Sequence, residues 1–484
     1  MKRIILIISC LLAFLAARAD GLRMPGFFSD NMVLQQKADA NIWGWADAGA
    51  TVKVKVSWSK AAYKAVAGED GFWKVAVATP EASFTPQTVT VTCGKEKLSL
   101  ANLLIGEVWL CSGQSNMEMP MGGWRFQPIE NGGQDMRDAR HYPGLRMVMI
   151  KKAVSETPLE DATGEWWTTD SGHIAEFSAS AYYFGRELTR ELGVPVGLIV
   201  PCWGGTMIEC WMDRESLIKG GIKGEDVDKD IRENKASTPW HTCTMMYNAM
   251  VYPLRHYTIN GFIWYQGCSN VGRIFVQDYA KLQAAMVTRW RELFGRGDLP
   301  FYYVQIAPHP YSSEGDSKLA APLRDRQKAA AKLVPNSAMI GTCDLVYEFE
   351  EGIIHPRKKA EIGERLAYLA LEKWYGFKNY GSDCPDLLKA TFNGPNAIVY
   401  LSNCGGGIHS DLGWEFKGVT GFEVAGEDKV WYPARITGTD GNSIGCTAPE
   451  VPEPKYVRYL WHDFAIGHLW NSYRLPVLPF TSEE

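Results

Sequence analysis

The pattern of apolar and polar residues divides the chain into three stretches. In the first, residues 20–100, Val52, Val54 and Val56 alternate strictly with polar residues, as in a strand with one face in water. Turn sequences around Gly49 and Gly71 separate such segments. We expect this stretch to form a small antiparallel β-sandwich.

In the second stretch, residues 101–380, apolar strands alternate with helices. Apolar residues spaced by four and three from Phe177 to Leu192 predict a helix that ends at Gly193. The same spacing predicts helices over 279–293 and 358–374, and short apolar runs predict buried strands at 108–110, 196–200, 261–265, 301–306 and 338–341. Such alternation is typical of a parallel sheet flanked by helices, which binds ligands at the carboxyl ends of its strands.

The last stretch, residues 381–484, returns to short strands. Apolar runs at 397–401, 421–424 and 458–461 predict β-structure, and we expect a second β-sandwich there.

The N-terminus has the pattern of an export signal. Lys2 and Arg3 precede an apolar run over 4–17, and Ala17 and Ala19 are the small residues expected before a cleavage site at Asp20. The alternative, a membrane anchor, is weaker because the run is too short to span a bilayer. We therefore expect residues 1–19 to be removed and the protein to be periplasmic or extracellular, with no membrane span.

Composition narrows the classes of function. The chain has 484 residues, 46% hydrophobic and 22% charged, and a net charge of −5. It has no basic run, which argues against binding to nucleic acid. Its cysteines are scattered without a CxxC pair, so neither a zinc ribbon nor a redox motif is indicated. We predict no metal and no cofactor.

Four motifs could carry chemistry, and each follows a predicted strand or precedes a helix. Ser115, after Gly113, could present a hydroxyl nucleophile at the sheet edge. The second motif, residues 203–206, could bind an oxyanion through the backbone N–H groups of Gly204 and Gly205. The third motif, residues 264–270, could add a side-chain amide, with Gln266 as the first choice and Asn270 as the second. His355, before a proline and a helix, could act as general base. His241 and His309 could line the same cleft. Each motif alone is also typical of an ordinary turn or cap. The order of the four motifs, each beside a predicted strand or helix, strengthens the case that they form one catalytic site.

Around these motifs the sequence resembles the sialate O-acetylesterase family of SGNH hydrolases. The resemblance includes IGEVWLCSGQSNMEM at 105–119, VPVGLIVPCWGGTMIECWM at 194–212 and GFIWYQGCSNVGR at 261–273, with FFSDNMVLQQ at 27–36 and VRYLWHDF at 457–464 outside the catalytic blocks. It implies an SGNH-type three-layer α/β/α parallel sheet flanked by N-terminal and C-terminal β-sandwich domains. It also implies removal of O-acetyl esters from carbohydrates without a metal.

The resemblance also implies roles for individual residues. Ser115 would be the nucleophile and His355 the base, acting through an acetyl-enzyme. The N–H groups of Ser115 and Gly205 (or Gly204), with the Gln266 side chain, would form the oxyanion hole. The side chains expected to contact substrate are those of Gln114, Asn116, Trp203, Asn270 and Arg273.

Two departures from the family pattern affect these roles. Cys268 stands where the family usually has Glu, either as a buried substitute, which we favour, or as a second nucleophile. The Asp that many members place two or three residues before the His is absent. The acid that orients His355 is therefore open: Asp344 is the first candidate, Glu350 and Glu351 follow, and a backbone carbonyl is a further alternative.

Three further hypotheses remain beside a sialate O-acetylesterase. The substrate could be an acetylated plant polysaccharide such as xylan or xyloglucan. Arg125 and Arg273 favour a sialic acid instead, because they could pair with its carboxylate. The chain could be a non-catalytic sugar-binding relative, as Cys268 and the absent Asp would allow. An exported serine protease is the least supported alternative.

Overall fold

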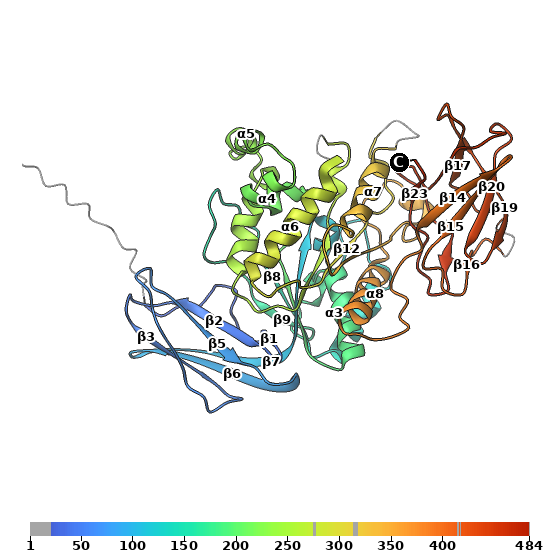
Figure 1. The fold of residues 1–484 in the computed structure, drawn as a ribbon. Helices are drawn as coiled ribbons and strands as arrows, with labels where there is room; N and C mark the ends of the chain where they lie inside the picture. Colours follow the sequence, from blue (N-terminus) through green and yellow to red (C-terminus); the bar gives the residue numbers. More distant parts are fainter. Residues whose placement is uncertain (1–20, 274–276, 313–317, 414–415, 417, 484) are drawn as a thin grey trace, which may run out of the picture.

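The computed structural model describes residues 21–273, 277–312, 318–413, 416 and 418–483. Figure 1 shows three parts in chain order: N-terminal strands, a middle part of strands and helices, and C-terminal strands. The predicted export signal, residues 1–19, lies outside the described residues. Among the helices that are described, none is long and apolar enough to cross a bilayer.

The N-terminal part is antiparallel for most of its length, as the alternation predicts. β3 (Thr51–Val56) exposes and buries its residues in strict alternation and pairs with β4 and β6. β2 and β5 pair with each other in a separate two-stranded sheet. The other strands here are β1 (Val33–Gln35), β2 (Asp39–Trp45), β4 (Tyr63–Val66), β5 (Phe72–Ala78) and β6 (Ser83–Cys93).

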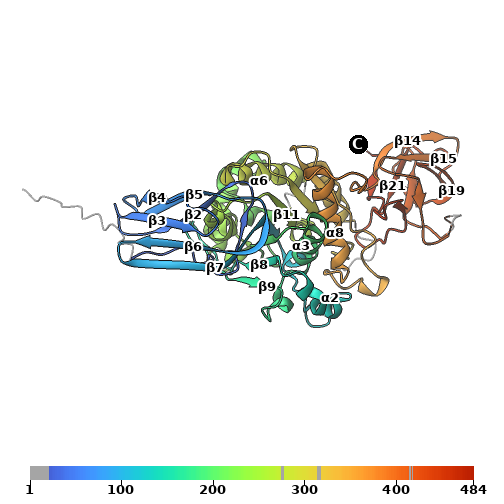
Figure 2. The same cartoon turned by 90° about the horizontal axis from the view of Figure 1, so that it is seen from below.

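One long strand, β7 (Glu96–Gly113), joins this part to the central sheet. Its first half pairs with β6 and, in parallel, with β1, while residues 107–113 pair with the neighbouring strands of the central sheet. β7 therefore runs straight across the boundary expected at residue 100. Strands of both parts pair with β7, which runs from one part into the other (Figure 2).

The central sheet has the strand order β13-β12-β11-β7-β10-β8-β9. Its pairs are parallel except for β8 with β9, which is antiparallel. Its further strands are β8 (Leu145–Met149), β9 (Trp166–Thr168), β10 (Val196–Val200), β11 (Gly261–Tyr265), β12 (Phe301–Val304) and β13 (Ser337–Ile340). The expected mixed α/β fold with a mostly parallel sheet and additional β-regions is confirmed.

The two faces of this sheet bury separate apolar cores. Val108 and Leu110 of β7 belong to one core, and Trp109 and Cys111 to the other. α6 (Tyr279–Phe294) packs into the first core, while α3 (Ala179–Leu192) and α8 (Lys359–Leu369) pack into the second. The remaining helices are α1 (Ser115–Glu118), α2 (Gly132–Asp138), α4 (Arg214–Lys219), α5 (Gly224–Asn234) and α7 (Ala320–Ala330).

The predicted helix ends are confirmed where glycine stops the helix. α3 ends at Gly193, whose φ of 65° is left-handed and whose N–H donates to Thr189 O. α6 ends in the same way at Gly295. α8 is followed by a π-helical turn, Ala370–Trp374, so the helix predicted over 358–374 is regular only as far as Leu369.

Some elements carry little sequence signal. α5 buries only Val227 of its eleven residues, and its apolar stripe is limited to Val227 and Ile231, too narrow to predict a helix from. β8 and β9 were also not predicted, because they are short and separated by a long irregular segment.

The described residues of the C-terminal part form two four-stranded sheets and one two-stranded sheet. The last strand predicted, 458–461, is shifted: β21 ends at Tyr459 because Leu460 has a φ of 50°, which a strand cannot continue through. The strands are β14 (Leu387–Asn393), β15 (Asn396–Leu401), β16 (Ile408–His409), β17 (Phe422–Ala425), β18 (Trp431–Pro433), β19 (Arg435–Asp440), β20 (Ser443–Thr447), β21 (Tyr456–Tyr459), β22 (Trp470–Asn471) and β23 (Phe480–Thr481).

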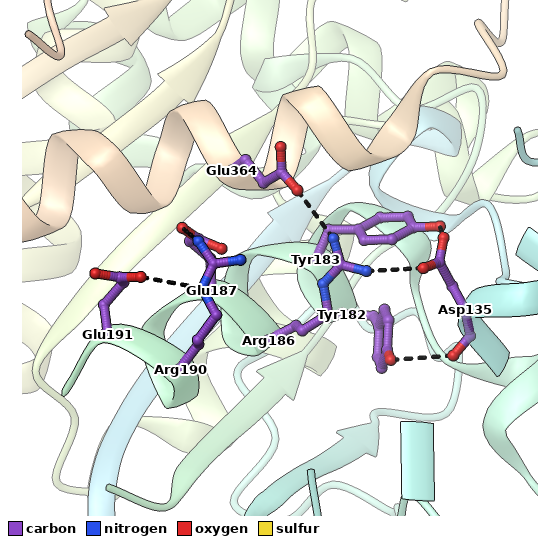
Figure 3. A network of polar contacts seen from close by, with 8 residues as sticks. All are labelled: Asp135, Tyr182, Tyr183, Arg186, Glu187, Arg190, Glu191 and Glu364. Carbon is purple, nitrogen blue, oxygen red and sulfur yellow. Dashed lines mark hydrogen bonds and ion pairs between the residues drawn. The ribbon is translucent and has the colours of Figure 1, made fainter. Parts of the chain in front are cut away.

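A polar network connects α3 with α2 and α8 (Figure 3). Arg186 of α3 binds Asp135 and Glu364, each at 2.9 Å, and Tyr183 donates to Asp135 at 2.7 Å. Arg186 is only 14% exposed, so these ion pairs are shielded from salt. They hold together the two helices that cover one face of the sheet.

Glu187, in the same network, should make the stability of the folded protein depend on pH. Its side chain is 1% exposed, and burial raises its pKa to about 7 despite the ion pair with Arg190. A carboxyl with a raised folded-state pKa binds protons more tightly when folded, so the free energy of unfolding should fall as pH rises from about 4.5 to about 7. Glu187→Gln should reduce this fall by up to about 3 kcal/mol, measured by urea unfolding across that range.

Glu191→Gln is the matched control. Glu191 lies on the same helix, and hydrogen bonds from Tyr380 and Arg190 lower its pKa. Removing it should weaken the protein at neutral pH and leave most of the fall between pH 4.5 and 7 in place, because burial, the largest cause of the raised pKa of Glu187, is unchanged. An identical pH dependence in wild type and Glu187→Gln would contradict the assignment to Glu187.

Candidate active site

Three of the four predicted motifs meet at the carboxyl ends of adjacent strands. Gly113 at the end of β7 is the register partner of Tyr265 at the end of β11, and it also bridges to Cys202 just beyond β10. The motifs that follow β7, β10 and β11 therefore lie side by side. This is the convergence expected of a parallel sheet.

The turn that carries Ser115 depends on close backbone contacts. Gly113 has a φ of 142°, and a Cβ there would lie 2.2 Å from Tyr265 O, so only glycine fits. The next residue, Gln114, donates its N–H to the same carbonyl at 3.0 Å. Ser115 then begins α1 and is half-buried, and its hydroxyl has no hydrogen-bond partner among the described residues. The hydroxyl is therefore free to react.

Asn116 connects this turn to the loop that carries His355. Its Nδ2 donates to Ile354 O at 3.0 Å, across 238 positions of sequence. Its Oδ1 accepts from Lys359 Nζ at 2.7 Å. Asn116 is fully buried, so these bonds do not compete with water. The residue after Ser115 is thus held against the residue before His355.

His355 has the surroundings of a neutral base. Its Nδ1 lies 2.6 Å from Gln127 Oε1, and Trp124 packs edge-on against the ring at 4.8 Å. Because an amide oxygen only accepts, Nδ1 carries the proton and Nε2 keeps its lone pair. Nε2 is shielded from water and has no partner among the described residues. Burial, then the charges of Lys359 and His309, lower the pKa of His355 to about 4.

Neither predicted acid contacts His355. Asp344 binds Arg365 through both oxygens, at 2.8 and 2.6 Å, and accepts from Trp470 Nε1 at 2.9 Å. Glu350 is buried and accepts from Arg357 and from the N–H of Tyr347. The expectation that Asp344, or Glu350, orients His355 is corrected, because these carboxylates are satisfied elsewhere and Gln127 occupies the position at Nδ1.

The structure favours Asn270 over Gln266 as the side chain that could donate to an oxyanion. Gln266 is fully buried; its Nε2 donates to Thr206 O and to Asn270 Oδ1, and its Oε1 accepts from Tyr279. Both amide hydrogens are committed, so the role predicted for Gln266 does not fit. Asn270, the second choice, gives one Nδ2 hydrogen to Glu209 at 2.8 Å and keeps the other unassigned among the described residues.

The two glycines after β10 differ in what their N–H groups do. Gly204 donates to Glu118 Oε2 at 2.6 Å, and a Cβ on it would come within 3.1 Å of Ser115 Cβ. No described residue accepts from the N–H of Gly205, whose φ of 79° is left-handed. Of the two, Gly205 therefore fits an oxyanion donor. His241 lies beside it, with Nε2 3.4 Å from where a Cβ would be.

The residues predicted to bind substrate fall into two groups. Gln114 and Asn116 are buried and structural: Gln114 Oε1 accepts from the N–H groups of Gly267 and Ser269. Their predicted contact with substrate is therefore corrected to a role in joining the loops. Trp203 is half-buried and Arg273 is exposed, with only its Nε committed, to Ser269 O. These two side chains remain available to a ligand.

Cys268 is buried, and burial raises the pKa of its thiol. Asn116 Nδ2 lies 3.9 Å from its sulfur. A protonated thiol packed behind the nucleophile turn fits the buried substitute favoured above better than a second nucleophile.

Gln127 and Lys359 were not identified from the sequence. Gln127 lies in an irregular segment with no motif. Lys359 did carry a signal: it lies three and seven residues before Ile362 and Leu366, on the apolar face of the predicted helix, where a lysine is unusual.

Comparisons with known proteins place this site in a family context. The model of the family described as "Carbohydrate esterase, sialic acid-specific acetylesterase" matches residues 105–372. The chain is 31% identical over 414 residues to the sialate O-acetylesterase of Homo sapiens, across 78% of this chain and 73% of that protein. It is 28% identical over 530 residues to that of Rattus norvegicus, across 96% and 94%.

A solved structure is similar over nearly the whole chain. A carbohydrate acetylesterase from Xanthomonas citri superposes with a TM-score of 0.83 at 30% identity, covering 95% of this chain and 99% of that one.

The environment of His355 predicts its titration. In wild type its ring should titrate near pH 4, in NMR spectra of protein labelled with ¹⁵N-histidine. Lys359→Met removes a neighbouring positive charge and should raise this pKa. Lys358→Met is the control, since Lys358 stacks on Tyr347 and does not contribute to the lowered pKa. Equal shifts in the two variants would contradict the role of Lys359.

Proposed function

Since the chain belongs to the sialic acid-specific acetylesterase family of carbohydrate esterases, and is therefore a carboxylic-ester hydrolase, we propose that it removes O-acetyl groups from carbohydrates through Ser115 and His355. The observation that carries the proposal is the hydrogen bond from Asn116 to Ile354 O, which holds the free hydroxyl and the free imidazole nitrogen on neighbouring loops.

The reaction proceeds in two halves. His355 Nε2 takes the proton of Ser115 as Oγ attacks the acetyl carbonyl carbon, and the negative charge develops on the carbonyl oxygen. The N–H groups of Ser115 and Gly205, with the Asn270 side chain, bind that oxygen. When the carbon–oxygen bond to the sugar breaks, the proton passes from His355 to the departing sugar hydroxyl. Water, deprotonated by His355, then attacks the acetyl-enzyme, and acetate leaves as the proton returns to Ser115.

Gln127 takes the place of the acid in this mechanism. Its Oε1 fixes the tautomer of His355 but adds no negative charge to balance the imidazolium that forms. We propose a Ser–His pair oriented by a neutral amide. Because Lys359 and burial also disfavour the charged ring, the base stays neutral down to low pH.

The finer architecture and the location belong to the same proposal. Residues 101–380 would be an SGNH-type three-layer α/β/α domain between β-sandwiches at 20–100 and 381–484. Residues 1–19 would direct export to the periplasm or the extracellular space. The pattern of Lys2, Arg3 and the following apolar run supports export.

The substrate we propose first is an O-acetylated sialic acid. Arg273, exposed beside the third motif, could bind a sialate carboxylate. The similarity to a carbohydrate acetylesterase favours acetylated polysaccharide as the second candidate. Acetate release from O-acetylated sialic acids, xylan and xyloglucan separates them: activity confined to the glucan or xylan would replace the first candidate by the second.

The nucleophile is tested on a small aryl acetate. Ser115→Ala should lower kcat by at least about 10³-fold, because no other group can form the acetyl-enzyme. Cys268→Ala should keep most of the activity. The reverse result, with loss in Cys268→Ala and activity in Ser115→Ala, would make the cysteine the nucleophile. Equal rates for wild type and Ser115→Ala would favour a non-catalytic sugar-binding protein.

The neutral partner of His355 predicts the pH dependence. In wild type the acid limb of kcat/KM should lie near pH 4, the pKa of His355. Gln127→Glu places a carboxylate at Nδ1, which favours the imidazolium, so this limb should move to higher pH. Gln127→Leu loses the tautomer and should lower kcat by about 10²–10⁴-fold. An unchanged acid limb in Gln127→Glu would show that His355 is not the base.

A further inference from the structure

A cavity of about 680 Å³ lies between α8 and the C-terminal strands, outside the residues assigned to catalysis. Its floor is one face of α8, formed by Glu361, Glu364, Arg365 and Tyr368, which are spaced as neighbours along a helix. Its opposite wall comes from residues 466–475 of the C-terminal part, and its third side from residues 344–349. Figure 2 shows α8 on the side of the middle part that faces the C-terminal strands.

The cavity is lined by polar groups of both signs. Several of these are already paired: Arg365 with Asp344, Glu364 with Arg186 (Figure 3), and His468 with Asp411 at 3.4 Å. Others have no ion-pair partner among the described residues: the carboxylates of Glu348 and Glu361, and the cations of Lys358 and Arg474. Lys358 and Arg474 instead lie over the rings of Tyr347 and Trp470, at 4.0 and 4.6 Å. Unpaired donors and acceptors therefore face one space.

Aromatic rings border the same cavity and are unusually exposed. Phe349 is 66% and Tyr473 45% exposed, although both are large apolar side chains. Phe349 is stacked on Tyr347 with the rings 5.0 Å apart and 10° from parallel. Tyr473 packs so closely on Gly381 that a Cβ there would lie 2.2 Å from the ring. Both rings are thus held in place while part of their surface stays open to solvent.

The cavity is connected to the catalytic loop through the backbone. The segment that forms its third side continues from Phe349 to His355, and Lys358, which also lines it, comes three residues after the histidine. Tyr347 donates to Glu130, whose N–H donates to Arg357 O. Gln127, the partner of His355, lies three residues before Glu130. A ligand in the cavity would therefore touch the segment that carries the base.

We propose that this cavity is a carbohydrate subsite that binds the sugar units adjoining the acetylated one, so that the enzyme acts best on oligosaccharides. A sugar has hydroxyls that pair with carboxylates and cations, and C–H faces that lie against aromatic rings, which matches this lining. The volume lies within the range of small-molecule sites, about 300–1,000 Å³. The inference rests on the function proposed above and extends it from a single acetylated sugar to a chain.

The test compares Phe349→Ala, Tyr473→Ala and the double variant with wild type on three substrates. These are a small aryl acetate, a free O-acetylated sialic acid, and acetylated oligosaccharides of xylan and of sialyllactose. On at least one oligosaccharide, the kcat/KM of the double variant should fall about tenfold because its KM rises. A tenfold change corresponds to the loss of about one aromatic contact. Its rates on the aryl acetate and the free sugar should stay unchanged, because neither reaches the cavity.

Leu388→Ala is the matched control, since Leu388 is a 64% exposed apolar residue of β14 outside the cavity. It should leave all three substrates unaffected. Unchanged kcat/KM of the double variant on every oligosaccharide would overturn the subsite, and so would an equal loss on all three substrates.

Binding measured without catalysis separates this inference from the function it rests on. Titration calorimetry of Ser115→Ala with the same acetylated oligosaccharides should show binding that weakens about tenfold when Phe349 and Tyr473 are also replaced. If Ser115→Ala keeps esterase activity but this binding difference is found, the catalytic proposal fails and the subsite stands. If Ser115→Ala is inactive and the binding is unaffected by the two substitutions, the subsite fails and the catalytic proposal stands.

Discussion

One buried carboxamide, that of Asn116, is the constraint on which the site depends. Its nitrogen binds the carbonyl before His355, its oxygen binds Lys359, and its backbone follows Ser115 directly. Two segments 238 positions apart in the sequence are thereby held in a single arrangement. In a site without competing water such bonds are strong, and losing any partner leaves a buried polar group unsatisfied. Asn116 therefore positions Ser115 and His355 without itself contacting the reacting atoms in the proposed mechanism.

The sheet supplies the other half of the arrangement. β10, β7 and β11 are adjacent and parallel, so the loops after them leave from the same edge. Gln114, which was expected to contact substrate, instead holds the loop after β11. Glu118 of α1 holds Gly204 in the loop after β10. Among the described residues, the groups left uncommitted include the hydroxyl of Ser115, the N–H of Gly205 and Nε2 of His355. In the proposed mechanism, this division leaves Ser115 free to act while the amides and small residues around it hold the loops together.

The surroundings of His355 differ from those of a base supported by a carboxylate. Gln127 orients the ring without charge, and Lys359 lies buried nearby with no carboxylate bound to it among the described residues. Both favour the neutral imidazole, whose pKa is lowered to about 4. Such a base accepts a proton less readily but is available over a wider range of pH. In the proposed mechanism, the oxyanion donors offset this loss of driving force.

Local periodicity in the sequence was enough to predict most of the regular elements, because burial of one face imposes a regular spacing of apolar residues. This holds for β3 with its alternating valines, for α3 and α6 with their terminal glycines, and for the buried strands of the central sheet. The positions of Ser115, Gly205 and His355 followed from motifs beside those elements. The partners of these residues did not: Gln127 meets His355 across 228 positions of sequence, and Lys359 binds Asn116 across 243. Asp344 pairs with Arg365 instead of His355. Which polar groups pair depends on distances in three dimensions, and these are set only when the helices and loops have packed on the sheet.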